Sequence, residues 1–597
     1  MIKRILAILS RKERRKLIGL FAAILVMALL EVVGVASILP FMQLAADPEA
    51  VSKNRWLFDL YEAAGFTTFR SMLISTGATV LLFITLANSF AILTIWLQQK
   101  YAWRVAHELC ARLLRTYLNR PYSYFLRKNT AELFSNLIIE VTQFSIGVLI
   151  PFLDLLARAM VTLVIFVLLL FVDPLIAIIV SGGLGLCYLS IYMLRKTSLQ
   201  KLGGDRVEAN LQRFKSMNEA LTSIKTSRVF GAQDFFFHRF EKASDKHSRI
   251  QPIVQLISVA PKYIIEILAF GGILAVMLYL LIRGENLQTT LPLLSIYALA
   301  GYRLLPALQK GFAAAANLRH SFPVVGKLEK DLQSAEQEAL IAASKDAVPI
   351  LQKSVRLKGI KFFYEGESLP VLSNIDLTIH KGQTVAFVGE TGSGKTTLVD
   401  LLTGLLYPQS GAIYIDDVVM QPSNAASWHR QIGYVPQDVF LFDDTVKRNI
   451  AIGLEDAEID MRRLEWAAQT ANIHSFITQE LPKGFETTIG ERGVRLSGGQ
   501  RQRLGLARAL YRQPGILILD EATSALDSIT EHAVIDSLKA AAGSLTVVIV
   551  AHRLSTVRHA DCIYVLERGK IIQEGPYETL LKTSDVFREM AQLSDTN

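Results

Sequence analysis

The feature that most constrains this chain is a series of long apolar stretches within its first 320 residues. A membrane-spanning helix needs about 20 mostly apolar residues. Six of the stretches are long enough to span. Six spans predict an all-α transmembrane domain that leaves both of its ends on the same side of the membrane. A hydrophobic fraction of 51% and a mean hydropathy of +0.32 support a membrane protein. The stretches of sufficient length cover residues 17–44, 72–97, 146–172, 175–194, 254–282 and 291–316.

Basic residues gather in two long connections between these stretches, at 100–128 and 195–249. Connections rich in Lys and Arg usually stay in the cytoplasm, so both chain ends are expected there. We therefore interpret the net charge of +9 as a topology signal rather than as a nucleic-acid-binding surface. Before the first span, apolar residues such as Ile5 and Leu9 alternate with Lys and Arg, which suits a short amphipathic helix on the membrane surface.

A change of composition divides the chain of 597 residues. Single domains usually stop growing near about 250 to 300 residues, so more than one domain is expected. The sequence turns polar at 326–350, which predicts a linker between a transmembrane domain at 1–325 and a second domain at 351–597. Beyond the linker, short apolar strands such as 384–388 and 516–519 alternate with helical stretches. This pattern predicts an α/β domain with a largely parallel core sheet.

A glycine-rich loop follows the first of these strands and opens a helical run. Its glycines let backbone N–H groups turn toward phosphates, and the helix N-terminus adds a positive dipole. Lys395 would reach the β- and γ-phosphates of a nucleotide, and the Thr396 hydroxyl would ligate Mg²⁺. By itself this loop indicates only that the chain binds a nucleotide. The loop and the start of its helix consist of Gly389, Glu390, Thr391, Gly392, Ser393, Gly394, Lys395, Thr396 and Thr397.

Two carboxylates, Asp520 and Glu521, end the apolar run at 516–519. Asp520 suits Mg²⁺ coordination, directly or through water. Glu521 suits the role of a general base that polarises the attacking water. A charge at a helix N-terminus is the alternative role for Glu521. The glycine-rich loop upstream favours hydrolysis of a nucleotide.

The segment 496–500 is the most discriminating motif, because it matches the signature of the ATP-binding cassette family without deviation. Further motifs of that family follow in order, and the chain resembles its exporters over nearly its whole length. The resemblance implies a six-helix transmembrane domain of exporter type joined to an α/β P-loop nucleotide-binding domain. It also implies ATP and Mg²⁺ as cofactors. The signature consists of Leu496, Ser497, Gly498, Gly499 and Gln500.

The same resemblance implies roles for single residues. Tyr364 would stack on adenine, Gln437 would ligate Mg²⁺ and sense the attacking water, and His552 would contact the γ-phosphate. The signature from Ser497 onward would bind the ATP of a partner cassette, and Asp527 would report across that contact. Because the chain carries one cassette, it must dimerise to complete a site. The absence of a degenerate motif favours a homodimer, and a heterodimer stays open.

ATP-driven export or flipping of an amphiphilic substrate across the inner membrane of a bacterium is the function that the resemblance implies. An ATP-gated channel or sensor is the alternative from another class, and the intact Glu521 and His552 argue against it. The six spans exclude the soluble cassette proteins that act on nucleic acid. Multidrug, lipid A and peptide exporters stay open, because cassette motifs are shared while substrate sites differ.

A narrower resemblance concerns the segments 31–48 and 302–306, which look like the bacterial flippases of lipid-linked oligosaccharides. In such flippases, basic residues of the transport cavity engage the pyrophosphate. Lys262 and Arg303 are the candidates here, since each lies in an apolar span, where a cation costs about 2.5 to 3.5 kcal/mol. Alternatively, Lys262 pairs with Glu266 one helical turn later, and Arg303 lies near a cytoplasmic helix end.

Overall fold

The computed structural model divides into two compact units. The first comprises Met1–Arg120 with Arg127–Glu336, and the second comprises Pro121–Leu126 with Gln337–Asn597. The division falls within 326–350, where the composition of the sequence changes. The structure describes residues 1–37, 41, 68–172, 174–283, 305–341, 348–490, 493–522, 530, 533, 534, 536–538, 545–551 and 557–595.

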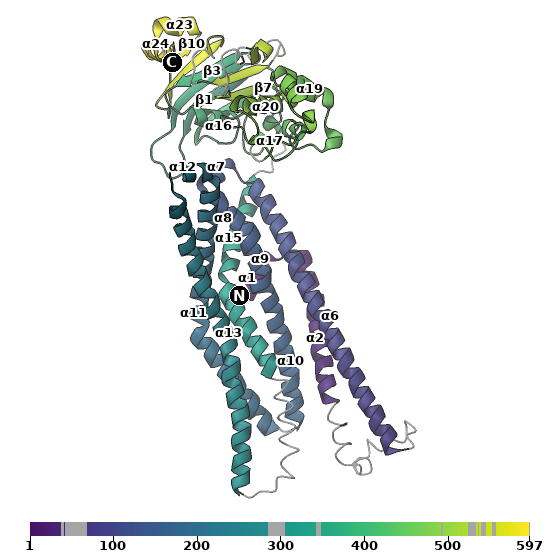
Figure 1. Ribbon diagram of the computed structural model, residues 1–597. Coiled ribbons are helices and arrows are strands. Elements are labelled where there is room, and N and C mark those ends of the chain that lie inside the picture. The colour runs from purple at the N-terminus through teal and green to yellow at the C-terminus, as the bar shows by residue number, and fades with distance from the viewer. Residues whose placement is uncertain are drawn as a thin grey trace. The chain divides into compact units, whose positions relative to one another are not determined.

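Long helices form the first unit (Figure 1). Thr68 caps the N-terminus of the longest apolar one, α6, by accepting a hydrogen bond from the Ser71 N–H. Two π-helical segments, η1 and η2, interrupt the chain ahead of α10. The helical segments are α1 (Ile2–Ile8), α2 (Arg11–Ala36), α6 (Phe69–Leu118), α7 (Tyr122–Arg127), α8 (Thr130–Ser135), η1 (Asn136–Glu140), α9 (Val141–Gln143), η2 (Phe144–Leu149), α10 (Ile150–Val172), α11 (Pro174–Thr222), α12 (Ile224–Val229), α13 (Gln233–Arg283) and α15 (Pro323–Ile341), with a further helix over 305–321.

Three helical stretches of the described chain are long and apolar enough to cross a membrane, and they contain most of the first three predicted spans. The fourth and fifth predicted spans, 175–194 and 254–282, are helical as parts of α11 and α13. Most of the sixth, 291–316, lies outside the described residues. The three qualifying stretches are Arg11–Gly34, Phe69–Leu118 and Thr130–Val167.

Helix α1 packs into the helical unit along its apolar face. The side chains of Ile5 and Ile8 belong to the buried core, with 1% and 2% of their surface exposed. On another side of the helix, the Arg4 Nε donates to a carboxylate oxygen of Glu329 on α15, 2.7 Å away. The sequence pattern suggested a helix on the membrane surface. In the structure, neighbouring helices of the same unit cover the side chains of Ile5 and Ile8 and remove them from water, and a place of the helix on the membrane surface stays a prediction.

A buried ion pair joins η1 to α11. The side chains of Glu140 and Arg206 are 0% and 3% exposed, and their charged atoms lie 3.5 Å apart. Gly203, one turn earlier on α11, lies so close to the His320 carbonyl that a Cβ at this position would collide with it. A buried charge that lost its partner would be costly, so the ion pair between Glu140 and Arg206 holds α11 against the segment that leads into α10.

Two sheets and their covering helices form most of the second unit, to which Tyr122–Leu126 of α7 also belong. The antiparallel sheet has the order β2-β1-β4-β5, and the larger sheet has the order β10-β9-β3-β8-β7-β6. The strands are β1 (Ser354–Phe362), β2 (Leu372–His380), β3 (Thr384–Gly389), β4 (Ser410–Ile415), β5 (Val418–Val419), β6 (Ile432–Val435), β7 (Ile516–Asp520), β8 (Thr546–Val550), β9 (Cys562–Glu567) and β10 (Lys570–Gly575). The helices are α16 (Lys395–Leu402), α17 (Ala425–His429), α18 (Val446–Ile450), η3 (Asp456–Glu458), α19 (Met461–Thr470), η4 (Phe476–Glu480), η5 (Gly484–Glu486), α20 (Gly498–Tyr511), α23 (Tyr577–Thr583) and α24 (Asp585–Asp595).

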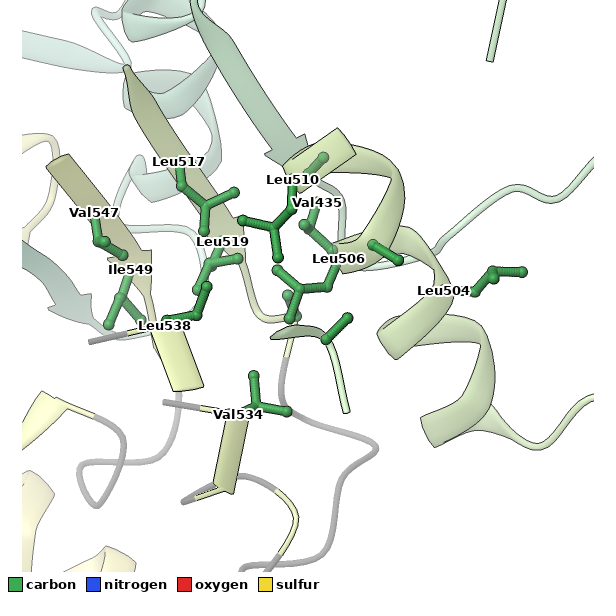
Figure 2. Packing of buried hydrophobic residues seen from close by; sticks show 14 of the residues in the cluster. Val435, Leu504, Leu506, Leu510, Leu517, Leu519, Val534, Leu538, Val547 and Ile549 are labelled. Carbon is green, nitrogen blue, oxygen red and sulfur yellow. The ribbon is translucent and has the colours of Figure 1, made fainter. Parts of the chain in front are cut away.

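The larger sheet is parallel from β6 to β9, and only β10 pairs in the antiparallel sense within its described strands. Every residue of β7 and β8 is buried, as expected for strands covered on both faces. In Figure 2, Leu506 and Leu510 of α20 lie close to Leu517 and Leu519 of β7, in the same buried cluster. Parallel strands end at one edge of a sheet, so the residues that follow β3 and β7 are brought to the same edge.

Candidate functional site

The glycine-rich loop between β3 and α16 wraps around the Lys395 side chain. Its ammonium donates to the carbonyl oxygens of Gly389 and Glu390 at 2.7 and 2.9 Å. Gly394 caps the helix with a φ of 103°, a left-handed conformation that favours glycine. A Cβ there would also lie 2.7 Å from the Leu372 Cδ2. The chain thus reaches the start of α16 with its first N–H groups turned toward the loop.

The loop offers an anion a lysine ammonium and a buried hydroxyl. Burial lowers the pKa of Lys395, and the nearby carboxylates of Glu521 and Asp520 oppose that shift. Ser393 is buried, and its Oγ has no hydrogen-bond partner among the described residues. A buried hydroxyl without a partner is costly, and a phosphate oxygen is an acceptor that would satisfy it. These features fit the nucleotide predicted from the sequence.

The two carboxylates at the end of β7 have separate hydrogen-bond donors. The Gln437 Nε2 donates to the Glu521 Oε2 at 2.6 Å, so the structure brings together two residues that the sequence assigned to one reaction. The Tyr434 hydroxyl donates to the Asp520 Oδ2 at 3.4 Å. Asp520 is 6% exposed. Asp520 and Glu521 also act electrostatically on Lys395, which places them near the glycine-rich loop.

Two residues near Asp520 were not anticipated from the sequence. Asp400 lies on α16 at 9% exposure, and its burial, followed by the neighbouring charge of Asp520, raises its pKa to about 6. Burial, followed by the charges of Asp520 and Asp400, raises the pKa of Tyr434, so its hydroxyl keeps its proton. The available signal for Asp400 was a carboxylate within the apolar helical run after Lys395. No local signal marked Tyr434, because its contact depends on how two strands align.

Tyr364 lies against the start of α16. Its hydroxyl and the Thr397 Oγ1 are 3.0 Å apart and share a hydrogen bond. Its ring meets Phe362 edge to face, with the centroids 5.1 Å apart. Tyr364 is therefore adjacent to the phosphate-binding loop, where an aromatic ring can reach a base attached to bound phosphates.

The signature forms the start of α20. The Ser497 Oγ accepts a hydrogen bond from the Gln500 N–H at 3.2 Å, and the Gln500 Oε1 accepts one from the Ser497 N–H at 2.8 Å. This reciprocal capping box satisfies two N–H groups. Gly498 and Gly499 form the first turn, and neither has a side chain that would cover the helix N-terminus. Ser497 itself is exposed.

Asp527, His552 and Arg303 lie outside the described residues. Lys262 is described, and its Nζ lies 3.7 Å from the Glu266 Oε1. The structure therefore contains the intrahelical ion pair that was the alternative to a substrate contact for Lys262. Both side chains are 33% exposed.

Comparison with known proteins identifies the family. Residues 372–524 match the ABC transporter family, and residues 4–298 match the ABC transporter transmembrane region. The heterocyst differentiation ATP-binding protein HepA of Nostoc sp. is 35% identical over 472 residues, which cover 77% of this chain and 74% of that protein. The chain belongs to the ABC transporters. The resemblance found in its signature is thereby confirmed.

Other relatives of this ABC transporter are named as exporters or flippases. The ATP-dependent lipid A-core flippase of Saccharophagus degradans is 33% identical over 482 residues, covering 79% of this chain and 78% of the flippase. The leukotoxin translocation ATP-binding protein LktB of Mannheimia haemolytica is 30% identical over 536 residues, covering 87% and 72%. The solved structure of a bacterial Atm1-family ABC exporter with ATP bound has a TM-score of 0.81 at 23% identity, over 97% of this chain and 98% of that one.

These relationships confirm the predicted fold class, a helical transmembrane domain joined to an α/β P-loop domain. They also confirm that the chain is an ATPase whose hydrolysis is coupled to transport. The transporter is an ATP-driven exporter of the membrane.

Proposed function

We propose that this ABC transporter uses Mg²⁺-dependent ATP hydrolysis to flip an anionic lipid, a lipid-linked oligosaccharide, across the inner membrane of a bacterium. Two copies of the chain form the transporter, with both termini and the cassettes in the cytoplasm. The placement of basic connections at 100–128 and 195–249 supports this orientation.

The residues at the sheet edge fit Mg²⁺, which prefers oxygen ligands. The Thr396 hydroxyl and the Asp520 carboxylate supply such oxygens, and Gln437 adds an amide oxygen on a neighbouring loop. When bound, Mg²⁺ neutralises charge on the transferred phosphoryl group. Lys395 contributes a fixed positive charge from within the loop, while Glu521 accepts the proton of the attacking water. Gln437 holds Glu521 in place through their 2.6 Å hydrogen bond.

The observation that carries the substrate proposal is a charged cluster on helices of the first unit, in which Asp154 and Arg158 are partly buried and Lys310 is exposed. Arg158 lies one turn after Asp154 on α10, and Lys310 lies on the helix over 305–321. Both cations are close enough to Asp154 to interact with its charge. This cluster of described residues therefore has a net positive charge within segments predicted to span the membrane. A cation in such a segment is costly unless it meets water, a partner or a ligand, and an anionic head group would provide one.

Lys262 and Arg303 extend the same proposal, because both are cations in predicted spans. The pair between Lys262 and Glu266 does not remove Lys262 from the set, since its side chain keeps a third of its surface exposed. A second candidate substrate is the lipid A-core, for which the relative from Saccharophagus degradans is named. Both candidates have phosphate groups on a lipid, and so they share the chemistry that the cations would recognise.

Reconstitution in liposomes tests this proposal. The full chain is offered a polyprenyl-pyrophosphate oligosaccharide, a lipid A-core and an uncharged drug, and flipping is measured together with ATP hydrolysis. Neutral variants of Arg158, Lys262, Arg303 and Lys310 should each lower flipping of the anionic lipid while basal hydrolysis persists. Arg249→Gln, which breaks an exposed pair with Asp245 on α13, is the matched control. Unchanged flipping in all four variants would refute the role of these cations.

A further inference from the structure

Strand β6 and the loop after it hold both carboxylates of the site. Gln437 in the loop donates to Glu521, and Tyr434 in the strand donates to Asp520. We propose that Tyr434 is a positioning residue that orients Asp520 toward Mg²⁺. This inference rests on the Mg²⁺-dependent hydrolysis proposed above.

The contact between Tyr434 and Asp520 follows from strand register. Tyr434 lies opposite Ile518 on the parallel strand β7. Asp520 is two residues further along β7, so its side chain lies on the same face as that of Ile518. Two residues of a strand advance about 6.6 Å, which a tyrosine side chain can span along the strand direction. An aliphatic residue at 434 would share the face but would have no donor for the carboxylate.

The backbone that carries Tyr434 is held firmly. A Cβ on Gly433 would lie 2.8 Å from the Pro514 Cγ and 3.0 Å from the Ala509 carbonyl oxygen, so β6 lies directly against the end of α20. Val435 on the other side of Tyr434 is fully buried in the core shown in Figure 2. The hydroxyl therefore approaches Asp520 from a fixed direction. Holding one carboxylate oxygen also limits rotation of the other.

Asp400 gives this hydrogen bond a further consequence. Its carboxylate on α16 interacts electrostatically with both Asp520 and Tyr434. Two neighbouring carboxylates repel each other, and a donor on one of them offsets part of that repulsion. The Tyr434 hydroxyl restrains Asp520 from turning away from Asp400, and its loss would remove that restraint. We therefore expect Mg²⁺ binding, rather than nucleotide binding itself, to depend on the hydroxyl.

Tyr434→Phe in the full-length Glu521→Gln chain tests the inference. Binding of a fluorescent N-methylanthraniloyl ATP is measured in EDTA and then over a range of free Mg²⁺. Affinity in EDTA should stay within about twofold of the parent. Mg²⁺ should raise the affinity for the nucleotide, and the free Mg²⁺ concentration at which half of that increase is reached should rise about tenfold in Tyr434→Phe. Loss of a group that orients a metal ligand costs about 10- to 100-fold in metal affinity. The long 3.4 Å bond places the expectation at the lower end. With Glu521 restored, high Mg²⁺ should recover hydrolysis.

Tyr564→Phe is the matched control. Its hydroxyl, on β9 of the same sheet, donates to the Thr378 carbonyl at 3.0 Å rather than to a carboxylate. The control should keep the parental Mg²⁺ midpoint. An unchanged midpoint in Tyr434→Phe, or an equal shift in both variants, would overturn this inference and leave the proposed function intact. If the parent itself showed no Mg²⁺ dependence, the proposed cofactor and the inference would fail together.

Discussion

At the scale of single residues, Glu521 has an unusual backbone conformation. Its φ of 50° lies in the left-handed region, which is uncommon for residues other than glycine. The Glu521 N–H donates to the Val550 carbonyl at 3.1 Å, so the turn is fixed to the neighbouring strand. The turn directs the carboxylate toward Gln437. Backbone strain of this kind clusters at functional sites, where the surrounding structure maintains it.

Replacing Glu521 by glutamine should preserve ATP binding and slow hydrolysis by about 10²- to 10⁴-fold, because the amide cannot accept a proton. Phosphate release at saturating ATP and binding of the fluorescent nucleotide measure the two effects. Asp438→Asn, which neutralises an exposed carboxylate next to Gln437, is the control. Hydrolysis at the wild-type rate in Glu521→Gln would exclude Glu521 as the base.

The sequence could predict the parts of the site that are local in the chain. The loop around Lys395 is local, because the glycines, the lysine and the helix start are contiguous. The pair of Gln437 and Glu521 was predictable only through family resemblance, since 84 positions separate the two residues. Tyr434 could not be predicted from composition or spacing, because its contact with Asp520 arises from the register between β6 and β7.

At the scale of elements, Asp416 fixes the segment that enters β1. Its Oδ1 accepts hydrogen bonds from the N–H groups of Lys353 and Ser354 at 2.7 and 2.9 Å, and its Oδ2 accepts one from Gln352 at 2.9 Å. Burial opposes ionisation, but these three N–H donors together hold the pKa of Asp416 below its usual value. The carboxylate thus binds the start of the nucleotide-binding domain to the end of β4.

Asp416→Ala should lower the free energy of unfolding by about 3 kcal/mol, because three N–H groups lose their acceptor and alanine disfavours the φ of 53°. Asp416→Asn keeps an acceptor oxygen and tolerates that φ, so about 1 kcal/mol is expected. A lowered folded pKa stabilises the fold above the unfolded pKa of about 3.9 and loses that effect as the pH falls through the folded value. Calorimetry of the full chain should therefore show that the difference in unfolding free energy between the wild type and Asp416→Ala shrinks below about pH 4. A pH-independent difference would contradict the assignment.

Helix α1 shows why amphipathic periodicity alone leaves an element's surroundings undetermined. The pattern around Ile5 predicts one apolar face, and both a membrane surface and a protein core can cover such a face. The choice depends on groups far from α1 in the sequence, such as Leu328 and Glu329, which no local pattern specifies. The long apolar helices were easier to predict, because their length alone specifies the membrane.

Paired substitutions distinguish the two environments of α1. Ile5→Ala should lower the free energy of unfolding by about 2 to 5 kcal/mol, because it leaves a cavity in the core. Ile2→Ala is the matched control on the same helix, since Ile2 is 55% exposed and should have little effect. Thermal unfolding in detergent measures both. Equal, small effects would instead place the whole helix on the membrane surface.

At the scale of the whole molecule, the proposed homodimer supplies the second cassette that completes the proposed site. Each chain contains a phosphate loop and a signature, and at the start of α20 the Ser497 and Gln500 side chains each accept a hydrogen bond from the backbone N–H of the other residue. This arrangement leaves the helix N-terminus exposed, where free N–H groups can hold a phosphate. The proposed homodimer would therefore place the signature of one chain against the ATP bound by the other.

ATP should trap this cassette pair in the Glu521→Gln chain, and Ser497→Arg should prevent trapping, because the larger side chain fills the space required by the partner's γ-phosphate. Ser497→Ala loses the same capping oxygen, at a cost of about 1 kcal/mol, without adding bulk, and should still permit trapping. Crosslinking between cassettes at saturating ATP and Mg²⁺ measures all three chains. Trapping in Ser497→Arg would show that the signature does not face the partner's nucleotide. If Ser497→Ala also prevented trapping, the effect of both variants would be assigned to the helix cap, because alanine adds no bulk.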